Sequence, residues 1–356
     1  MNNLENRVFD KDKMFPSYNC FISSLGTYFN ILNEPVYDIK LSLHLQWQFF
    51  YREQEQFSSE QRIIGEYPYI NDKLLLDRLK KTLSYNIDII KTTDYESKDL
   101  DNFIAEWGYA IIFVNKRIIN RILKQPEEDE SITTVLISSA NMKDGYVFCK
   151  PNFYGVTEYN ESGIIKREDL NKARFSSING HDLHGDYITC NKISQKSEIN
   201  KSKYICITLL DVINRYLDGK DTQIELLDSC WYGKKAMHCF AERILHWATI
   251  YEPDLLFQRL DISAMGLIFV KRQRCVFFEL IYLIQKNNHI AIPKCTLRQL
   301  ELLEKNILDQ WGDLRMYMRL VCYKKQISSL QNISDFFRTI AILEMEYLNI
   351  LKNHLL

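Results

Sequence analysis

The chain has 356 residues, which is more than one hydrophobic core usually serves, so its length favours two domains. Hydrophobic residues make up 46% of the chain and aromatic residues 13%, a composition that excludes an intrinsically disordered protein. Its 45 basic and 46 acidic residues give a formal net charge of -1, so no overall charge draws it to nucleic acid or to an anionic membrane. We therefore predict neither as a partner.

The first residues and the cysteines indicate a reducing compartment. The start, MNNLENRVFDKDK, lacks the apolar core of a secretory signal, and no run approaches the roughly 18 apolar residues of a membrane span. The nine cysteines form no CxxC pair and mostly lie in apolar stretches, which is typical of buried, reduced thiols. We predict a cytoplasmic protein without a metal site and, since no Gly-rich phosphate loop is apparent, without a cofactor.

The first half of the chain predicts helices and then strands. Apolar residues at helical spacing predict helices at residues 18–32, 39–51 and 72–83. Short β-branched or aromatic runs bounded by turn residues predict strands at residues 87–91, 109–114, 133–138 and 146–150. The last two strands look like a hairpin, and a short helix is expected after it, at residues 169–174.

The second half predicts helices throughout. Residues 176–202 are polar and rich in Ser, Asn, Gly and Lys, the clearest change of composition in the sequence, so we place the domain boundary there. Helices are then expected at residues 205–217, 231–251, 255–285, 297–308, 315–330 and 333–355. The predicted fold class is α+β: a mixed domain with a small antiparallel sheet at 1–180, a linker at 181–202 and an all-α domain at 203–356.

Cys20 is the best candidate for covalent chemistry. It lies near the start of the first predicted helix, after the polar residues Ser17, Tyr18 and Asn19, which suit a helix cap and possible oxyanion donors. The thiolate is the nucleophilic form of cysteine, and a helix N-terminus stabilises an anion through its N–H groups and dipole. The alternative is that Cys20 is one more small buried hydrophobic residue.

Several segments resemble the N-terminal domain of butirosin biosynthesis protein H, over roughly residues 10 to 175. They are FPSYNCFISSLGTYFNIL, GYAIIFVNKRI, TTVLISSANMKDGYVFCKPNF and IIKREDLNKAR. The resemblance implies a papain-like fold in which a cysteine accepts an acyl group from a carrier-protein thioester and passes it to an amine. It implies an acyl or peptidyl carrier protein and an amine acceptor as partners, in natural-product biosynthesis, with a homo- or hetero-oligomer as a further expectation.

The sequence departs from this family at the two residues that should activate the thiol. The family carries a catalytic His at the start of the first hairpin strand and an Asp at the end of the second. Here those places hold Thr133 or Thr134 and, before Pro151, Lys150. Neither threonine nor lysine can replace that pair, because a thiol needs an oriented base within about 3 Å. We therefore expect no complete triad on the hairpin, with Lys150 able at most to favour a thiolate electrostatically.

A replacement base is available further along, in the segment NGHDLHGDYITC. His181, Asp182, His184 and Asp186 lie together there, and in an extended chain His184 and Asp186 project on the same face. A loop folding back over Cys20 would bring them to the thiol. The alternative is a solvated linker whose histidines have no role.

Three functions remain in view from the sequence. The first is acyl transfer with amide formation by Cys20, with His184, Asp186 and His181 as candidate catalytic residues. The second is a pseudoenzyme that keeps the papain-like shell and binds a carrier protein or an active paralogue. The third is a hydrolytic protease, but hydrolysis would need the same missing base as acyl transfer.

Overall fold

The computed structural model describes residues 9–52, 73–92, 95–124, 131–139, 145–150, 154, 161–178, 181–193, 200–219 and 230–355. The chain divides into two compact units, each built from two segments. Unit 1 contains Met1–Leu43 and Tyr69–Ser197, and unit 2 contains His44–Pro68 and Glu198–Leu356. The second boundary lies within the predicted linker, but the assignment of residues 44–68 to the C-terminal unit was not predicted.

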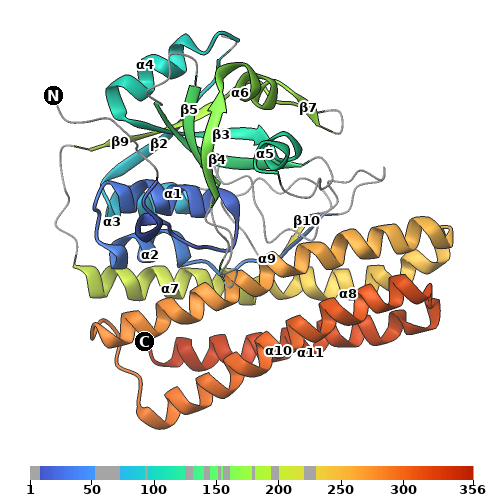
Figure 1. Cartoon of the computed structure of the whole chain (residues 1–356). Coiled ribbons are helices and arrows are strands. Elements are labelled where there is room, and N and C mark those ends of the chain that lie inside the picture. Colours follow the sequence, from blue (N-terminus) through green and yellow to red (C-terminus); the bar gives the residue numbers. More distant parts are fainter. Residues whose placement is uncertain are drawn as a thin grey trace. The chain divides into compact units, whose positions relative to one another are not determined.

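Six of the described strands in unit 1 form one antiparallel sheet (Figure 1). They are β2 (Tyr85–Ile90), β3 (Tyr109–Asn115), β4 (Ile132–Ser139), β5 (Gly145–Lys150), β6 (Glu161–Lys166) and β9 (Tyr187–Lys192). Their order is β2-β9-β3-β4-β5-β6, so β9 is an internal strand. The expected linker therefore contributes to the sheet: Tyr187, Ile188 and Cys190 are buried, although the polar residues around them concealed the strand.

Helices cover both faces of this sheet. The helices of unit 1 are α1 (Cys20–Ile31), α2 (Val36–His44), α3 (Lys73–Thr82), α4 (Lys98–Trp107), α5 (Lys116–Ile122) and α6 (Arg167–Arg174), after a short 3-10 helix at Lys11–Lys13. Residues of α4, α5 and α6 share one apolar cluster with Val135 and Ile137 of β4. Because side chains alternate along a strand, Thr134 and Leu136 of β4 project from the opposite face, which α1 covers.

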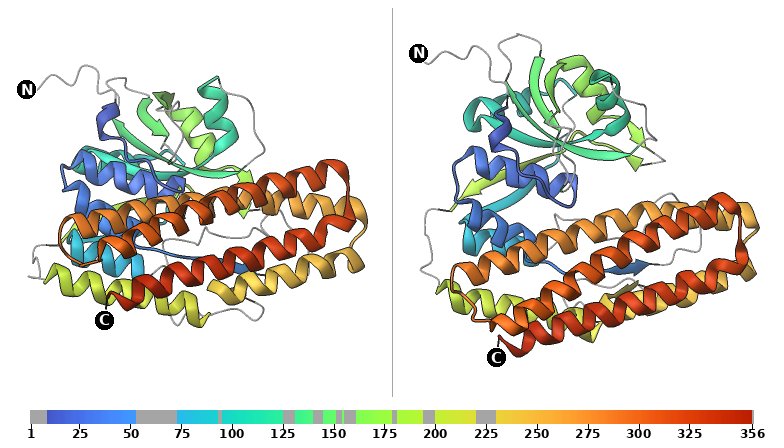
Figure 2. Two further views of the ribbon diagram at one scale, coloured as in Figure 1. Left: turned by 90° about the horizontal axis from the view of Figure 1, so that it is seen from below. Right: turned by 60° about the horizontal axis from the view of Figure 1, so that its bottom comes forward.

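Unit 2 consists of long helices and a two-stranded ribbon. The helices are α7 (Lys201–Asp218), α8 (Gly233–Ile250), α9 (Pro253–Lys286), α10 (Lys294–Lys324) and α11 (Leu330–Asn353), with a 3-10 turn at Ile327–Ser329, and the longest of them run alongside one another in Figure 2. Two prolines mark helix starts: Pro253 lies in the first turn of α9, and Pro293 lies at the N-cap of α10.

Three expectations that concern residues of this unit were wrong. Residues 297–308 and 315–330 were expected as separate helices, but α10 is continuous through the polar residues between them. The unit is also not all-α, since β1 (Phe50–Arg52) pairs with β10 (Cys230–Tyr232). The helix expected at residues 39–51 ends at His44; the chain beyond it is not helical and leads into β1, and its aromatic residues Trp47, Phe49 and Phe50 are buried.

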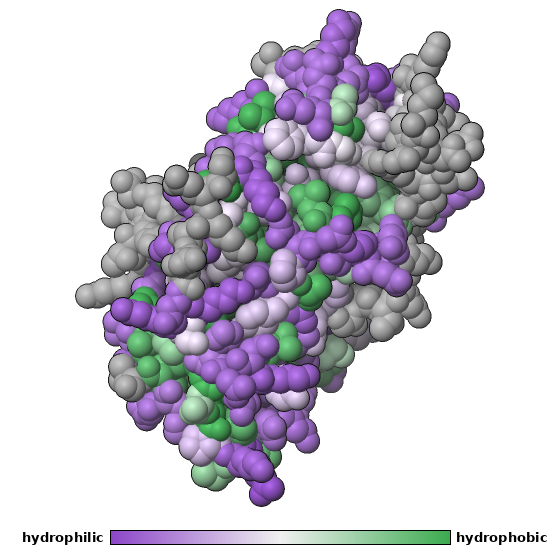
Figure 3. Space-filling view, turned by 90° about the vertical axis from the view of Figure 1, so that its left-hand side faces the viewer, coloured by the Kyte–Doolittle hydropathy of each residue, from purple (hydrophilic) through white to green (hydrophobic). Residues whose placement is uncertain are grey.

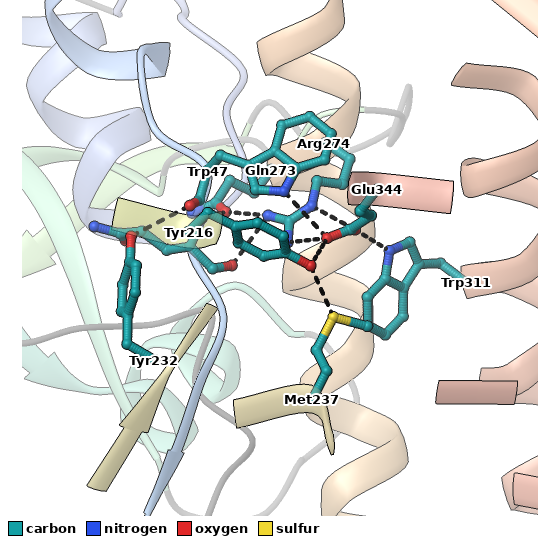
Figure 4. A network of polar contacts seen from close by, with 9 residues as sticks. Trp47, Tyr216, Tyr232, Met237, Gln273, Arg274, Trp311 and Glu344 are labelled. Atoms are coloured by element: carbon teal, nitrogen blue, oxygen red, sulfur yellow. Dashed lines mark hydrogen bonds and ion pairs between the residues drawn. The ribbon is translucent and has the colours of Figure 1, made fainter. Parts of the chain in front are cut away.

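A buried carboxylate organises the core of unit 2 (Figure 4). Glu344 on α11 is fully buried and forms an ion pair with Arg274 on α9, with Nε–Oε1 at 2.8 Å and Nη2–Oε2 at 3.0 Å. It also accepts hydrogen bonds from the indoles of Trp47 (3.1 Å) and Trp311 (2.8 Å) and from the Tyr216 hydroxyl (2.6 Å). This many donors offset the desolvation that would otherwise exclude a charged carboxylate from a core.

The same network holds the extended segment that precedes β1. Arg274 Nη1 donates to the Gln48 carbonyl (3.0 Å) and to Gln273 Oε1 (2.6 Å), which also accepts the Gln48 amide (2.8 Å). The Gly233 amide donates to the Phe49 carbonyl at 2.8 Å. Residues from the first quarter of the sequence are thus part of the helical core.

On the face shown in Figure 3, hydrophobic residues form small areas between hydrophilic ones. Among the described helices, none has the combined length and apolarity that crossing a membrane requires. Within the same residues, no cluster of three or more His, Cys, Asp or Glu side chains could hold a metal ion.

Candidate functional site

Cys20 is the first residue of α1, in agreement with its predicted position near the start of a helix. Asn19 forms the N-cap in an extended conformation (φ -145°, ψ 168°), and its Oδ1 accepts a hydrogen bond from the Ile22 amide at 2.9 Å. Cys20 is partly exposed, whereas the next nine residues of the helix are buried. A helix N-terminus therefore carries the thiol at its accessible end, which is where first-turn N–H groups favour negative charge.

The segment leading into α1 is fixed on both sides. The Tyr154 amide donates to the Ser17 carbonyl at 2.7 Å, and the Phe15 amide donates to Thr27 Oγ1 at 3.0 Å. Tyr18 is fully buried. Cys20 is consequently held in position by the packed chain on its N-terminal side as well as by its helix.

The strand β4 lies against α1 one helical turn beyond Cys20. Ser24 Oγ and Thr134 Oγ1 are 3.0 Å apart in a buried hydrogen bond, and Ser24 follows Cys20 by four residues, so both lie on the same side of the helix. Of the two candidate positions for the family's His, Thr134 is therefore the one on the α1 face. Thr133 projects from the opposite face of the sheet.

Lys150 also projects away from α1. Paired residues in antiparallel strands share a face, and Phe148, two residues before Lys150, belongs to the apolar cluster on the opposite face. The Lys150 ammonium donates to Asn120 Oδ1 on α5 at 2.8 Å. From the sequence, the Lys150 charge could have stabilised a Cys20 thiolate. This geometry does not support that role.

The replacement base expected at residues 181–186 is attached elsewhere. The strands β7 (Ser177–Ile178) and β8 (His181–Asp182) form a small hairpin. The Leu183 amide donates to the Ser176 carbonyl (2.9 Å) and the Gly185 amide to the Arg174 carbonyl (3.1 Å), which connects the segment to the end of α6. The segment is thus hydrogen-bonded to the end of α6, whose Leu170 and Ala173 pack on the sheet face opposite α1.

The individual candidates in this segment have separate surroundings. His184 is exposed, and Asp186 Oδ1 accepts the Thr92 amide at 3.4 Å. The side chains of His181 and Asp182 lie outside the described residues.

Other cysteines in unit 1 differ from Cys20 in their environment. Burial raises the pKa of the Cys149 thiol to about 12, and burial followed by the charge of Asp88 raises the pKa of Cys190 further. These thiols stay protonated near neutral pH and so are poor nucleophiles. Cys295 is exposed and lies in the first turn of α10 in unit 2, which makes it a useful comparison for Cys20.

Sequence reasoning missed the Ser24–Thr134 pair and the arrangement of the Asn19 amide. The Oδ1 of Asn19 is engaged in the cap, whereas its buried Nδ2 has no hydrogen-bond partner among the described residues. A polar residue directly before Cys20 was a visible signal, but the free donor could be found only from the fold.

No protein-family model matches the sequence, and no curated protein matches it either. The case for a function therefore depends on the geometry around Cys20.

Proposed function

We propose that unit 1 is a papain-like thiol acyltransferase in which Cys20 accepts an acyl group from a carrier-protein thioester and transfers it to an amine. The observation that supports this most is the position of Cys20, partly exposed as the first residue of a buried helix that packs against an antiparallel sheet. This position favours an accessible, stabilised thiolate.

In the first step the Cys20 sulfur attacks the thioester carbonyl carbon. A carbon–sulfur bond to Cys20 forms, the bond to the carrier's thiol breaks, and the carrier leaves as a thiolate that takes up a proton. In the second step an amine attacks the acyl-cysteine, an amide bond forms, the amine loses a proton and the Cys20 thiol is released. Both bonds broken are thioesters, so no oxidant or metal is needed.

The two sheet positions that should activate the thiol favour a second candidate. Thr134 forms a buried hydrogen bond with Ser24, and a hydroxyl does not accept protons near neutral pH. Lys150 contacts Asn120 on the other face. These observations suit a pseudoenzyme that binds a carrier protein or an active paralogue without transferring an acyl group.

Intact-mass measurement after incubation with a thioester distinguishes the two candidates. As probes we suggest the acetyl thioester of N-acetylcysteamine and an acetyl-loaded carrier protein. We expect an acetyl adduct on the wild type that is lost in Cys20→Ala. Cys295→Ala is the matched control, because it removes an exposed cysteine from the first turn of another helix.

The remaining variants test the alternatives. His184→Ala and His181→Ala should leave the adduct unchanged, and loss of the adduct in either would mean that the segment after α6 supplies the base. An adduct lost in Cys295→Ala but retained in Cys20→Ala would show non-specific thiol chemistry. Absence of any adduct, with carrier-protein binding measured by calorimetry, would favour the pseudoenzyme.

A further inference from the structure

We propose, on the basis of the acyl transfer proposed above, that the side-chain amide of Asn19 binds the oxyanion that forms on the acyl group when Cys20 attacks it. Asn19 is fully buried and immediately precedes Cys20. Its Nδ2 has no hydrogen-bond partner among the described residues. Buried amide donors are almost always paired, so this one points to an acceptor that arrives with the substrate.

The orientation of this amide is fixed by its other atom. The Ile22 amide can donate only to an oxygen, so the atom 2.9 Å from it is Oδ1 and the second atom is the NH₂ group. The side chain is thereby held against the first turn of α1, the turn that begins with Cys20. Nδ2 is a positioned donor at the same helix end as the thiol.

Acyl transfer creates the charge that such a donor would bind. As the Cys20 sulfur bonds to the carbonyl carbon, the electron pair of the C=O π bond moves to the oxygen, which becomes an oxyanion. When the intermediate collapses, that pair re-forms the carbonyl and the carrier's thiolate leaves. Asn19 gives up no proton in either direction; it donates a hydrogen bond that is stronger to the oxyanion than to the carbonyl.

Two substitutions separate this role from capping. Asn19→Ser keeps a side-chain oxygen for the Ile22 amide but removes the NH₂ group. Asn19→Asp keeps the cap and replaces the donor by a carboxylate oxygen, which accepts hydrogen bonds only and repels an oxyanion. Asn115→Ser is the matched control, since Asn115 caps α5 in the same way, with Oδ1 accepting the Arg117 amide at 3.0 Å.

Two reactions of the same thiol give the readout. Acetylation by the acetyl thioester of N-acetylcysteamine passes through an oxyanion, whereas alkylation by iodoacetamide is a direct displacement at carbon without one. Both rates are measured at Cys20 by mass spectrometry on the full chain. We expect Asn19→Ser to lower the ratio of acetylation to alkylation by about 100-fold and Asn19→Asp by more, with Asn115→Ser unchanged.

The ratio corrects for altered access or reactivity of the thiol, since both reactions need the same sulfur. If the ratio in Asn19→Ser and Asn19→Asp equals that of the wild type, Asn19 is only a cap and the inference fails while the proposed function stands. If wild-type Cys20 is alkylated but never acetylated, the proposed function fails, and this inference fails with it. Thermal unfolding of each variant identifies any loss of the cap itself.

Discussion

Two buried polar groups, one in each unit, differ in how completely their hydrogen bonds are satisfied. In unit 2 the carboxylate of Glu344 receives hydrogen bonds or ion-pair contacts from Arg274, Trp47, Trp311 and Tyr216. In unit 1, at the start of α1, the buried amide nitrogen of Asn19 has no acceptor among the described residues. A buried polar group whose hydrogen bonds are all made stabilises the fold, whereas a buried donor without an acceptor is a place where a substrate could supply one.

The largest effect in unit 2 should come from Glu344→Gln. The substitution leaves the buried Arg274 without its counter-charge, so we expect the free energy of unfolding to fall by about 3–5 kcal/mol. Urea denaturation measures the loss, and hydrogen exchange should place it in α9 and α11. The control Glu346→Gln changes an exposed residue of the same helix and should alter stability by less than about 0.5 kcal/mol. Equal losses in the two variants would contradict a structural role for the network.

A smaller loss is expected from Trp47→Phe. The indole donates to Glu344, stacks on Tyr347 with centroids 5.5 Å apart and lies beneath the Arg274 guanidinium at 4.4 Å. Removing the N–H group and part of the ring should cost about 2–3 kcal/mol. Trp107→Phe is the control, because Trp107 is 42% exposed in α4 of unit 1. Exchange protection that is lost in unit 1 and retained in unit 2 would refute the assignment of Trp47 to the helical core.

Glu304 on α10 should make the stability of unit 2 depend on pH. Burial, partly offset by the hydrogen bond from Tyr347, raises the pKa of this carboxyl from 4.5 to about 7. Between these pH values the folded state holds a proton on Glu304 that the unfolded state has released. The contribution of this proton to the free energy of unfolding is therefore fully present below pH 4.5 and is lost by about pH 7.

We therefore expect Glu304→Gln to match the wild type near pH 4 and to exceed it by about 1–2 kcal/mol at pH 8, a figure reduced for partial solvent exposure. Denaturant unfolding at several pH values measures the difference. A constant difference between Glu304→Gln and the wild type across this range would rule out the titration.

The smallest effect should be in unit 1, at the hydroxyl pair beside Cys20. In a double-mutant cycle of Ser24→Ala and Thr134→Val, we expect a coupling energy of about 1 kcal/mol, because either single change leaves a buried hydroxyl without its partner. Urea denaturation of the four proteins gives the coupling. A coupling energy near zero would mean that the two hydroxyls do not interact, and it would contradict the position assigned to Thr134 beside α1.

Much of the fold could be predicted from local patterns. The first helix, the strands β2 to β5 and most helices of unit 2 follow from apolar spacing within short windows. The strand β9 was missed because four apolar or small residues lie within a long polar stretch, and α4 and α5 were missed between strands whose pattern was stronger. The start of α1 at Cys20 was predictable because a capping residue and an apolar run are adjacent in sequence.

The site itself depended on tertiary structure. From the sequence, Thr133 and Thr134 are equally good candidates for the place of the His in the family that the chain resembles, and only strand register shows that Thr134 projects toward α1. Similarly, the sequence leaves the surroundings of His184 and Asp186 open, whereas the structure joins their segment by backbone hydrogen bonds to the end of α6 and Asp186 to the Thr92 amide.

By itself, the sequence determined the apolar spacing of most helices and of strands β2 to β5, the position of Cys20 near a helix start and the absence of a His at the hairpin positions, because these depend on residues that are neighbours along the chain. The tertiary structure decided which faces meet: Ser24 with Thr134 over 110 residues and Trp47 with Glu344 over 297 residues. Such pairings depend on how complete elements pack, and no local spacing encodes a partner at that separation.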